Sequence, residues 1–418
     1  MPQPVPDASQ HQVTRRTPTV LISVLAFATG ASIANLYYAQ PLVASIAREI
    51  GISPDLAGSV VSVTQIAYGL GLFLLVSLAD LIENKRLVRI LLSIATLGLI
   101  VSALSSSATI FFAASFLVGL CSVAAQVLLP YIAHLVPEER RGRVVGNVMA
   151  GVLSGIMLAR PIALFIAGSF GWRSVFWFSA VLMIAIILAL SWMMPRHEPR
   201  NAMGYHRILT SMVRLFRDSP ILQRRAMYQA LMFGAFNMFW TAVPLLLADR
   251  FGLSQHGIAL FALAGAGGAL AAPFAGRLAD RGLIRITSAG TMIVLGLSFY
   301  GARWAASGMS LIALALLAVL IDGAVQGNQV VSQRIIFSGP AATRGRTNAI
   351  YMTMQFAGGA IGSVLGTVTY ERGGWTATAT AGGIVAVITL LLFATESRSG
   401  KFVLKAKENQ NENAKRRD

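Results

Sequence analysis

The chain has 418 residues, of which 55% are hydrophobic and 12% charged, and its mean hydropathy is +0.66. So few polar side chains cannot cover a water-soluble protein of this size. The net charge of +17 is spread over short segments between apolar runs instead of forming a basic face with interleaved aromatic residues, so we expect no nucleic-acid partner. The composition therefore predicts a membrane protein with many spans.

Apolar runs of about 20 residues, the length that a helix needs to cross the hydrocarbon, recur along the chain. The first run follows a polar segment, residues 1–17, whose Arg15 and Arg16 make it similar to a signal peptide. Because this run is long and many others follow, we expect an uncleaved first helix. The twelve predicted spans are 18–39, 54–79, 87–106, 109–133, 144–168, 174–194, 226–248, 255–279, 286–305, 309–332, 347–369 and 375–395.

The two halves of the chain repeat one another around a basic linker, residues 195–225. Residues of the first half recur in the second at a nearly constant offset of 200 to 203 positions: Asn35 as Asn237, Pro41 as Pro244, Asp80 as Asp280, Gln126 as Gln326 and Trp172 as Trp375. A constant offset indicates a duplicated unit. We therefore predict an all-α membrane protein in which twelve transmembrane helices form two pseudo-symmetric six-helix bundles, residues 18–194 and 226–395.

The positions of the basic residues predict the orientation in the membrane. If the spans alternate, 28 of the 34 Lys and Arg residues fall on one side, in the two tails, the linker and the loops on that side. Cytoplasmic loops carry this excess. We expect both tails, residues 1–17 and 396–418, to be cytoplasmic, the lysine-rich second tail to be disordered, and the basic loops to contact anionic membrane lipid.

Glycines spaced four residues apart predict close helix packing. They occur as Gly151 and Gly155 in the fifth span and as Gly358, Gly362 and Gly366 in the eleventh. Small residues at this spacing let two helix backbones approach each other in lipid.

The sequence offers no catalytic or metal site. The single cysteine, Cys121, lies in an apolar run, and the five histidines lack the spacing of metal ligands. A phosphate-binding GxxxxGK loop followed by Ser or Thr is also missing, so we expect no ATP, no cofactor and no enzymatic activity.

The paired loops resemble the major facilitator superfamily across all twelve spans. Residues 276–282 (GRLADRG) follow the superfamily's signature after the second helix of a bundle, with the second glycine one place early. The first copy departs from it, because Val76, Leu81 and Glu83 replace the glycines and the arginine. Longer phrases are similar to the bacterial drug and sugar efflux-like permeases: 35–42 (NLYYAQPL), 65–71 (QIAYGLG), 158–161 (LARP), 322–329 (DGAVQGNQ) and 348–363 (NAIYMTMQFAGGAIGS).

Asp322 is the first candidate for a functional residue. It lies about 13 residues into the tenth span, near the middle of the bilayer, and is the only acid deep in a predicted span. A charge there costs about 3 kcal/mol on insertion scales, and burial favours the neutral acid. A carboxyl that is neutral when buried and charged when wetted suits proton coupling. The alternative is a structural acid held by an arginine or by amides.

In the superfamily that the sequence resembles, spans one, four, seven and ten line a central cavity. The resemblance implies that polar and aromatic residues on these spans contact the substrate: Asn35, Tyr38, Gln126, Asn237, Trp240, Gln326 and Gln329. Amides and aromatic rings together suit an amphipathic molecule. The alternative is that the amides bond neighbouring helices to one another.

Arg160 is the only cation deep inside a predicted span, because the other cations within the predicted spans, such as Arg89 and Arg277, lie within three residues of a span's end. Helix rise places it roughly 7 to 10 Å from Asp322 in depth, so a long side chain could pair with that acid. The other interpretation is that Arg160 faces the substrate cavity and attracts an anionic group.

Charged residues at the cytoplasmic ends of spans two and eight are candidates for a conformational latch. Asp80 with Arg86, and Asp280 with Arg281, would hold one conformation by charge pairs that break when the halves rock.

Together these features predict a secondary transporter of the bacterial inner membrane with alternating access. We expect it to export a small organic molecule, such as a drug, sugar or metabolite, as a proton antiporter in which Asp322 releases the proton. We expect a monomer. Proton-coupled or facilitated uptake of a metabolite is the alternative direction, and a membrane sensor without transport is the alternative from another class.

Overall fold

In this computed structural model, residues 19–136, 138–195, 204–265, 267–268, 271–340 and 343–398 are described. The predicted tail 1–17, most of the tail 396–418 and residues 196–203 of the predicted linker lie outside this part. Its helices are α1 (Thr19–Ala34), η1 (Gln40–Leu42), α2 (Val43–Ile50), η2 (Pro54–Leu56), α3 (Ser59–Leu74), η3 (Val76–Asp80), α4 (Asn84–Leu104), α5 (Ala108–Cys121), α6 (Ala124–Leu135), α7 (Glu138–Phe170), α8 (Arg173–Met193), α9 (Tyr205–Asp218), α10 (Pro220–Asp249), α11 (Gln255–Gly265), α12 (Ala271–Asp280), α13 (Ile284–Ser307), α14 (Leu311–Ile336), α15 (Arg344–Ala394) and η6 (Thr395–Arg398).

The helices correspond to the predicted spans. Nine helical segments in the described part of the chain are long and apolar enough to cross a bilayer. One of them, α15, contains two spans, because its helical backbone is interrupted at Gly373 and Gly374. The shorter α1 forms the first span, and α11 and α12 both fall within the eighth, so the all-helical fold class is confirmed.

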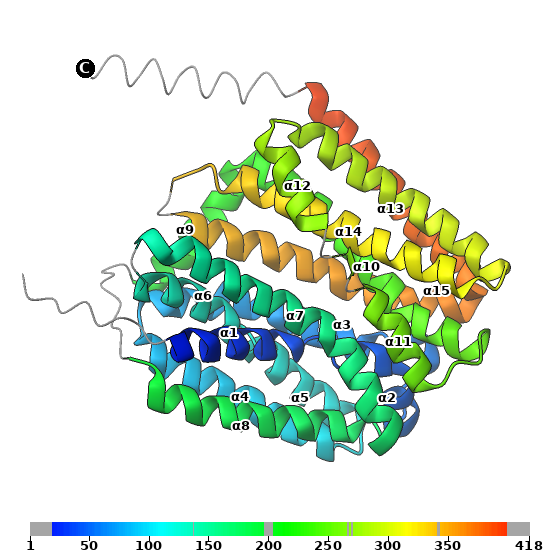
Figure 1. The fold of residues 1–418 in the computed structure, drawn as a ribbon, viewed down its shortest axis with the longest axis horizontal. Helices are drawn as coiled ribbons and strands as arrows, with labels where there is room; N and C mark the ends of the chain where they lie inside the picture. The colour runs from blue at the N-terminus through cyan, green and yellow to red at the C-terminus, as the bar shows by residue number, and fades with distance from the viewer. Residues whose placement is uncertain are drawn as a thin grey trace, which may run out of the picture.

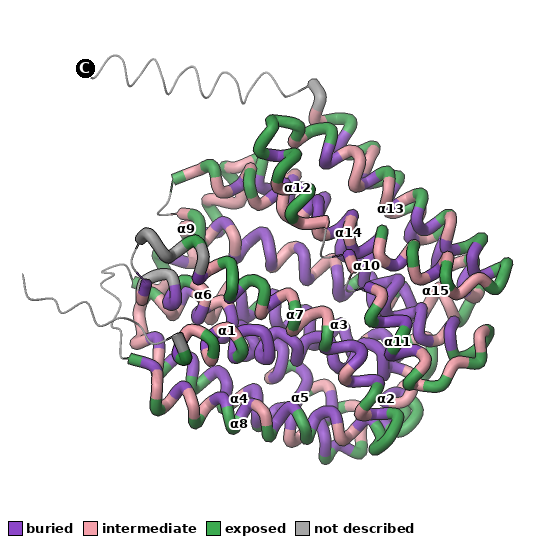
Figure 2. Tube along the Cα trace, in the orientation of Figure 1, coloured by how far each residue is buried: buried purple, intermediate pink, exposed green. Residues whose placement is uncertain are grey.

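The two halves of the chain lie side by side, with the helices of the first half along one side and most of those of the second along the other (Figure 1). We call the end of the molecule that carries α9 the linker end, and the end that carries α2 the distal end. Buried residues concentrate where the halves meet, and exposed ones on outer helices such as α13 (Figure 2). In the most apolar part of α10, 89% of the residues are buried, against 33% in α13, so α10 is central and α13 peripheral.

The halves are joined along α3 and α15. The Ser62 hydroxyl donates to the Ala360 carbonyl over 2.5 Å, and the Thr353 hydroxyl to the Gly69 carbonyl over 3.0 Å. At the distal end, the Gly58 amide donates to the Thr367 hydroxyl over 3.1 Å. A second contact between the halves is made by α7 and α11.

Close packing at the predicted glycines is confirmed. A side chain at Gly155 would collide with the backbone of Gly30 on α1, and one at Gly362 with the backbone of Gly234 on α10. Because glycine has no side chain, each of these helix pairs approaches backbone to backbone.

The first span differs from its prediction as a single helix over 18–39. α1 ends at Ala34, and after a turn the chain continues as η1 and α2 to Ile50. The matching helix α10 continues through Asn237 without a break. The proline that matches Pro41, Pro244, lies inside the unbroken α10, so the proline does not account for the difference.

The linker contains a helix that contacts both halves. The Tyr205 hydroxyl of α9 donates to the Leu74 carbonyl over 3.0 Å, and the Ser211 hydroxyl accepts from Arg346 over 2.8 Å. α10 then begins at Pro220, six residues before the predicted span. Its N-cap is Ser219, whose hydroxyl accepts from the Leu222 amide.

Candidate functional site

A buried arginine from the first half lies among aromatic rings at the centre of the molecule. Arg160 of α7 is 4% exposed, and its guanidinium carbon lies 5.3 Å from the ring centre of Tyr37, 5.1 Å from that of Phe236 and 4.5 Å from that of Trp240. Its Nε donates to Oε1 of Gln40 over 2.9 Å. Its Nη2 has no hydrogen-bond partner within the described part of the chain. Cation–π attraction therefore replaces part of the hydration that this charge has lost.

The buried acid from the second half meets the same ring. Asp322 of α14 is 7% exposed, and its Oδ1 accepts from the indole Nε1 of Trp240 over 2.6 Å. The charges of Arg160 and Asp322 attract each other. Trp240 contacts both side chains directly, through its ring face and its N–H respectively. A side chain at Gly265 would collide with the indole and come within 3.1 Å of Oδ2 of Asp322, so this glycine leaves room for the pair.

Amide side chains extend the cluster across the boundary between the halves. Oδ1 of Asn237 accepts from Nε2 of Gln40 over 2.9 Å and from Nε2 of Gln65 over 2.6 Å. Gln40 thus links Asn237 to Arg160, because its Oε1 accepts from the arginine. The Asn237 amide nitrogen donates to the Phe233 carbonyl of its own helix over 2.9 Å, which fixes its orientation. Four chain segments, η1, α3, α7 and α10, meet in this network.

The break after α1 brings Tyr37 and Gln40 into the cluster. Residues 35–39 form turns between α1 and η1, and Tyr37 and Gln40 are buried there. Interrupted helices are tolerated within membrane proteins where other protein groups satisfy the freed backbone, and transporters often bind their substrates at such breaks.

Four predicted site residues come together in this cluster, which we call the central cluster: Arg160, Asn237, Trp240 and Asp322, joined by Gln40, Gln65, Tyr37 and Phe236. Sequence reasoning did not single out the last four. Gln40 lies in the phrase NLYYAQPL and Gln65 in the phrase QIAYGLG. An amide side chain inside an apolar run is the sequence feature that could have identified each of them.

The other predicted cavity residues have different partners. Asn35 accepts from the Ser179 hydroxyl of α8 over 2.5 Å, within the first half. Gln126 donates to the Tyr68 hydroxyl over 3.3 Å, and Gln329 lies 3.9 Å from the Met352 sulfur. Tyr38 is buried, and Gln326 is half-buried on α14.

The predicted latch residues are distributed over two sites at the linker end. Asp280 forms an ion pair with Arg334 inside the second half. Asp80 is exposed and interacts electrostatically with Arg346 of the second half, which also bonds Ser211 of the linker helix. Arg86 and Arg281 are exposed, and neither forms an ion pair with a described residue.

Within the described residues, no group of three or more His, Cys, Asp or Glu side chains is arranged to hold a metal ion. Cys121 is buried. The members of the central cluster are one acid, one cation, amides and aromatic rings.

Comparisons with known proteins agree with this architecture. The model of the Major Facilitator Superfamily matches residues 23–336. The chain is 38% identical over 374 residues to the "Uncharacterized transporter YgaY" of Escherichia coli O157:H7, covering 89% of this chain and 94% of that protein. It is 30% identical to the "Probable transporter SCO4007" of Streptomyces coelicolor, covering 88% of this chain and 84% of that protein.

A solved structure has the same fold at low sequence identity. The bacterial homologue of the human lysosomal transporter Spinster, in its inward-facing and occupied conformation, superposes with a TM-score of 0.74 at 13% identity, covering 91% of this chain and 97% of that one. The family match covers most of the chain, and the relatives span nearly its whole length. The chain therefore belongs to the major facilitator superfamily and is a membrane transporter of that type, not an enzyme.

Proposed function

We propose that the protein is a proton antiporter of the bacterial inner membrane that exports a small organic molecule by alternating access. The observation that carries this proposal is the arrangement of Asp322 and Arg160, one from each half, on a single indole ring, that of Trp240. A buried acid in a membrane span is rare unless it marks a pathway.

The central cluster supplies a physical route to coupling. When Asp322 is charged, its carboxylate is stabilised by the hydrogen bond from the Trp240 indole N–H and by the nearby charge of Arg160. The same hydrogen bond holds the indole in place. When Asp322 is protonated, its charge is lost, and the hold on the indole weakens. If the substrate stacks on the Trp240 indole while the indole is held in place, protonation of Asp322 lowers the affinity of the protein for the substrate. By linkage, the substrate then displaces the proton to the same extent, which is the requirement for antiport.

The amide bonds between the halves support a rocking movement. Gln40 and Gln65 of the first half share the Oδ1 acceptor of Asn237, so these bonds must break or re-form if the halves rotate. In the conformation that opens the cluster, we place Asn35, Tyr38, Gln126, Gln326 and Gln329 along the substrate cavity with the central cluster. A single chain supplies both halves, so a monomer suffices.

The latch and the orientation complete the proposal. The linker end carries the basic loops, and we assign it to the cytoplasm with both termini. Asp80 and Arg346 there hold the halves together, and Asp280 with Arg334 braces the second half. Arg86 and Arg281 are exposed and add positive charge to the linker end.

The proposal is tested in a bacterial host that lacks its own efflux pumps. Cells that express the wild type are screened against amphipathic compounds, and hits are compared with Asp322→Asn and with Asp218→Asn, an exposed acid on α9. We expect lower accumulation of at least one compound in wild-type and Asp218→Asn cells, and no gradient-driven difference with Asp322→Asn. Equal export by Asp322→Asn would remove this acid from the mechanism, and higher accumulation in wild-type cells would reverse the direction.

A further inference from the structure

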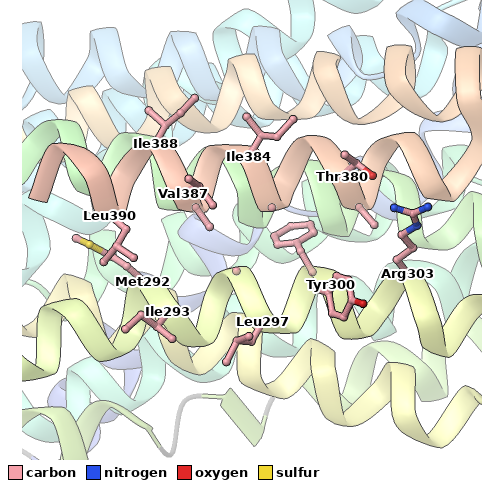
Figure 3. A pocket seen from close by; sticks show the side chains of 15 residues that line it. Met292, Ile293, Leu297, Tyr300, Arg303, Thr380, Ile384, Val387, Ile388 and Leu390 are labelled. Carbon is pink, nitrogen blue, oxygen red and sulfur yellow. The ribbon is translucent and has the colours of Figure 1, made fainter. Parts of the chain in front are cut away.

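A groove runs along the outer surface of the second half, between α13 and the last span of α15 (Figure 3). It has a volume of about 530 Å³. Its walls include Ile293 and Leu297 of α13 and Ile384 and Val387 of α15, all of them 46 to 64% exposed. In a membrane-spanning region, side chains exposed on the outer surface face the lipid.

Small residues create the hollow. Gly296 and Gly383 belong to its lining, and a side chain added at Gly383 would meet nothing within 4 Å. Two facing helices with larger residues at these positions would close the groove against each other. In this protein the groove stays open between the branched side chains of α13 and those of α15.

One end of the groove carries the positive charge. Arg303 and Thr380 lie across from each other at that end, with the exposed ring of Tyr300 beside them, whereas Met292 and Leu390 lie at the other end (Figure 3). Arg303 is exposed and forms no ion pair with a described carboxylate. It stands one turn before the distal end of α13, at the level where arginines reach the lipid headgroups.

The length of the groove matches one leaflet. Arg303 and Met292 are eleven residues apart on α13, which is roughly 16 Å at the rise of an α-helix. Half of a typical hydrocarbon core is about 15 Å. A lipid whose phosphate lies at Arg303 would therefore extend its acyl chain to Met292 and Leu390, near the middle of the membrane.

From this geometry we propose that the groove binds one acyl chain of an anionic phospholipid of the distal leaflet, with Arg303 holding its phosphate. Phosphate oxygens accept the guanidinium donors, and the apolar walls cover the chain. The site lies on the outer surface of the second half, away from the central cluster, so it stands whether or not Asp322 couples transport to protons.

Native mass spectrometry of the full-length protein in detergent tests the site with phosphatidylglycerol as the probe. Arg303→Gln removes the charge. Gly383→Leu adds a branched side chain to the groove lining, at a position where a Cβ meets nothing within 4 Å. Arg372→Gln is the control because it removes an exposed cation at the same end. We expect Arg303→Gln to reduce occupancy about fivefold, the effect of one cation beside anionic lipid, and Gly383→Leu to abolish it. The Arg372→Gln variant should bind as the wild type does.

The competing occupants give different results. Wild-type protein should retain phosphatidylglycerol over phosphatidylcholine, and glycerol phosphate, which has no acyl chain, should not compete. Equal retention of the two lipids, or unchanged binding by Arg303→Gln and Gly383→Leu, would overturn the proposal. A dimer that forms in the wild type and is lost in Gly383→Leu would also overturn it, because the groove would then hold a second copy of the chain.

Discussion

Trp240 of α10 donates its indole N–H to Asp322 of α14 over 2.6 Å, so the one acid of the central cluster is bonded to its largest aromatic ring. Arg160 of α7 lies over that ring at 4.5 Å. Cation and acid come from different halves of the chain and meet at one side chain. Any movement of the halves relative to each other must alter the surroundings of Asp322.

Replacing the indole by a ring without a donor should change the pH dependence of transport. Trp240→Phe keeps an aromatic face near Arg160 but removes the bond to Asp322. Because that bond stabilises the charged carboxylate, its loss favours the neutral acid. We expect the pH profile of transport to move upward by about one pH unit, the equivalent of one hydrogen bond to a charged group. An unchanged profile in Trp240→Phe cells would show that the indole does not tune the acid.

Removing the shared amide acceptor should shift the balance between conformations. Asn237→Ala leaves Gln40 and Gln65 without their common partner across the halves, and each bond contributes about 1 kcal/mol. We expect this conformation to lose about tenfold or more in population. Spin labels at Leu56 and Glu371, exposed residues at the distal ends of the two halves, would report the change as a longer distance in a Cys121→Ser background.

Asn328→Ala is the matched control for that experiment. Asn328 donates to Gln229 over 2.8 Å, and both residues belong to the second half. The control should lower stability without changing the distance between the labels. If the two variants gave the same distance distribution, the amide bonds between the halves would have no part in the conformational balance.

Filling the closest helix contact should destabilise the fold. A valine at Gly362 would collide with the backbone of Gly234, and overpacking of this kind costs about 1 to 3 kcal/mol. Gly146→Val, at a position where an added Cβ meets nothing within 4 Å, should be nearly neutral. Thermal unfolding of the purified variants, followed by tryptophan fluorescence, would compare them. Equal melting temperatures would argue against backbone contact between α10 and α15.

The twelve spans could be predicted from the sequence because length and hydropathy suffice for helices in lipid. Asp322 and Arg160 stood out because charges inside apolar runs are rare. The break after Ala34 could not be predicted, since Asn237 occurs in an unbroken helix at the matching position of the second half. Helical spacing no longer applies beyond such a break, so Tyr37 and Gln40 were missed.

The amides show a second limit of sequence reasoning. Asn35 and Gln65 both occur in apolar runs, yet Asn35 bonds Ser179 inside its own half and Gln65 bonds Asn237 across the halves. A polar residue in a span needs a partner, but the sequence does not say whether that partner is on a neighbouring helix of the same half or across the boundary between the halves. Only the packing of the halves distinguishes the two.

Neutralising Asp80 should slightly weaken the contact between the two halves at the linker end. Asp80 is exposed, so its interaction with Arg346 should contribute about 1 kcal/mol or less and weaken with salt. We expect Asp80→Asn to widen the distance between spin labels across the linker end at low salt and to have no effect at high salt. The exchanged pair, Asp80→Arg with Arg346→Asp, should restore the narrow distance. A distance that does not respond to either change would remove this pair from the latch.

Infrared difference spectroscopy of the purified protein tests most directly whether Asp322 carries the proton, because it needs no substrate. The C=O stretch of a protonated buried carboxylic acid is followed while the pH is changed, in the wild type, Asp322→Asn and Asp218→Asn. We predict a band that titrates in the wild type and in Asp218→Asn and that is missing in Asp322→Asn. A titrating band that remains in Asp322→Asn would contradict the account, because the proton would then reside on another group.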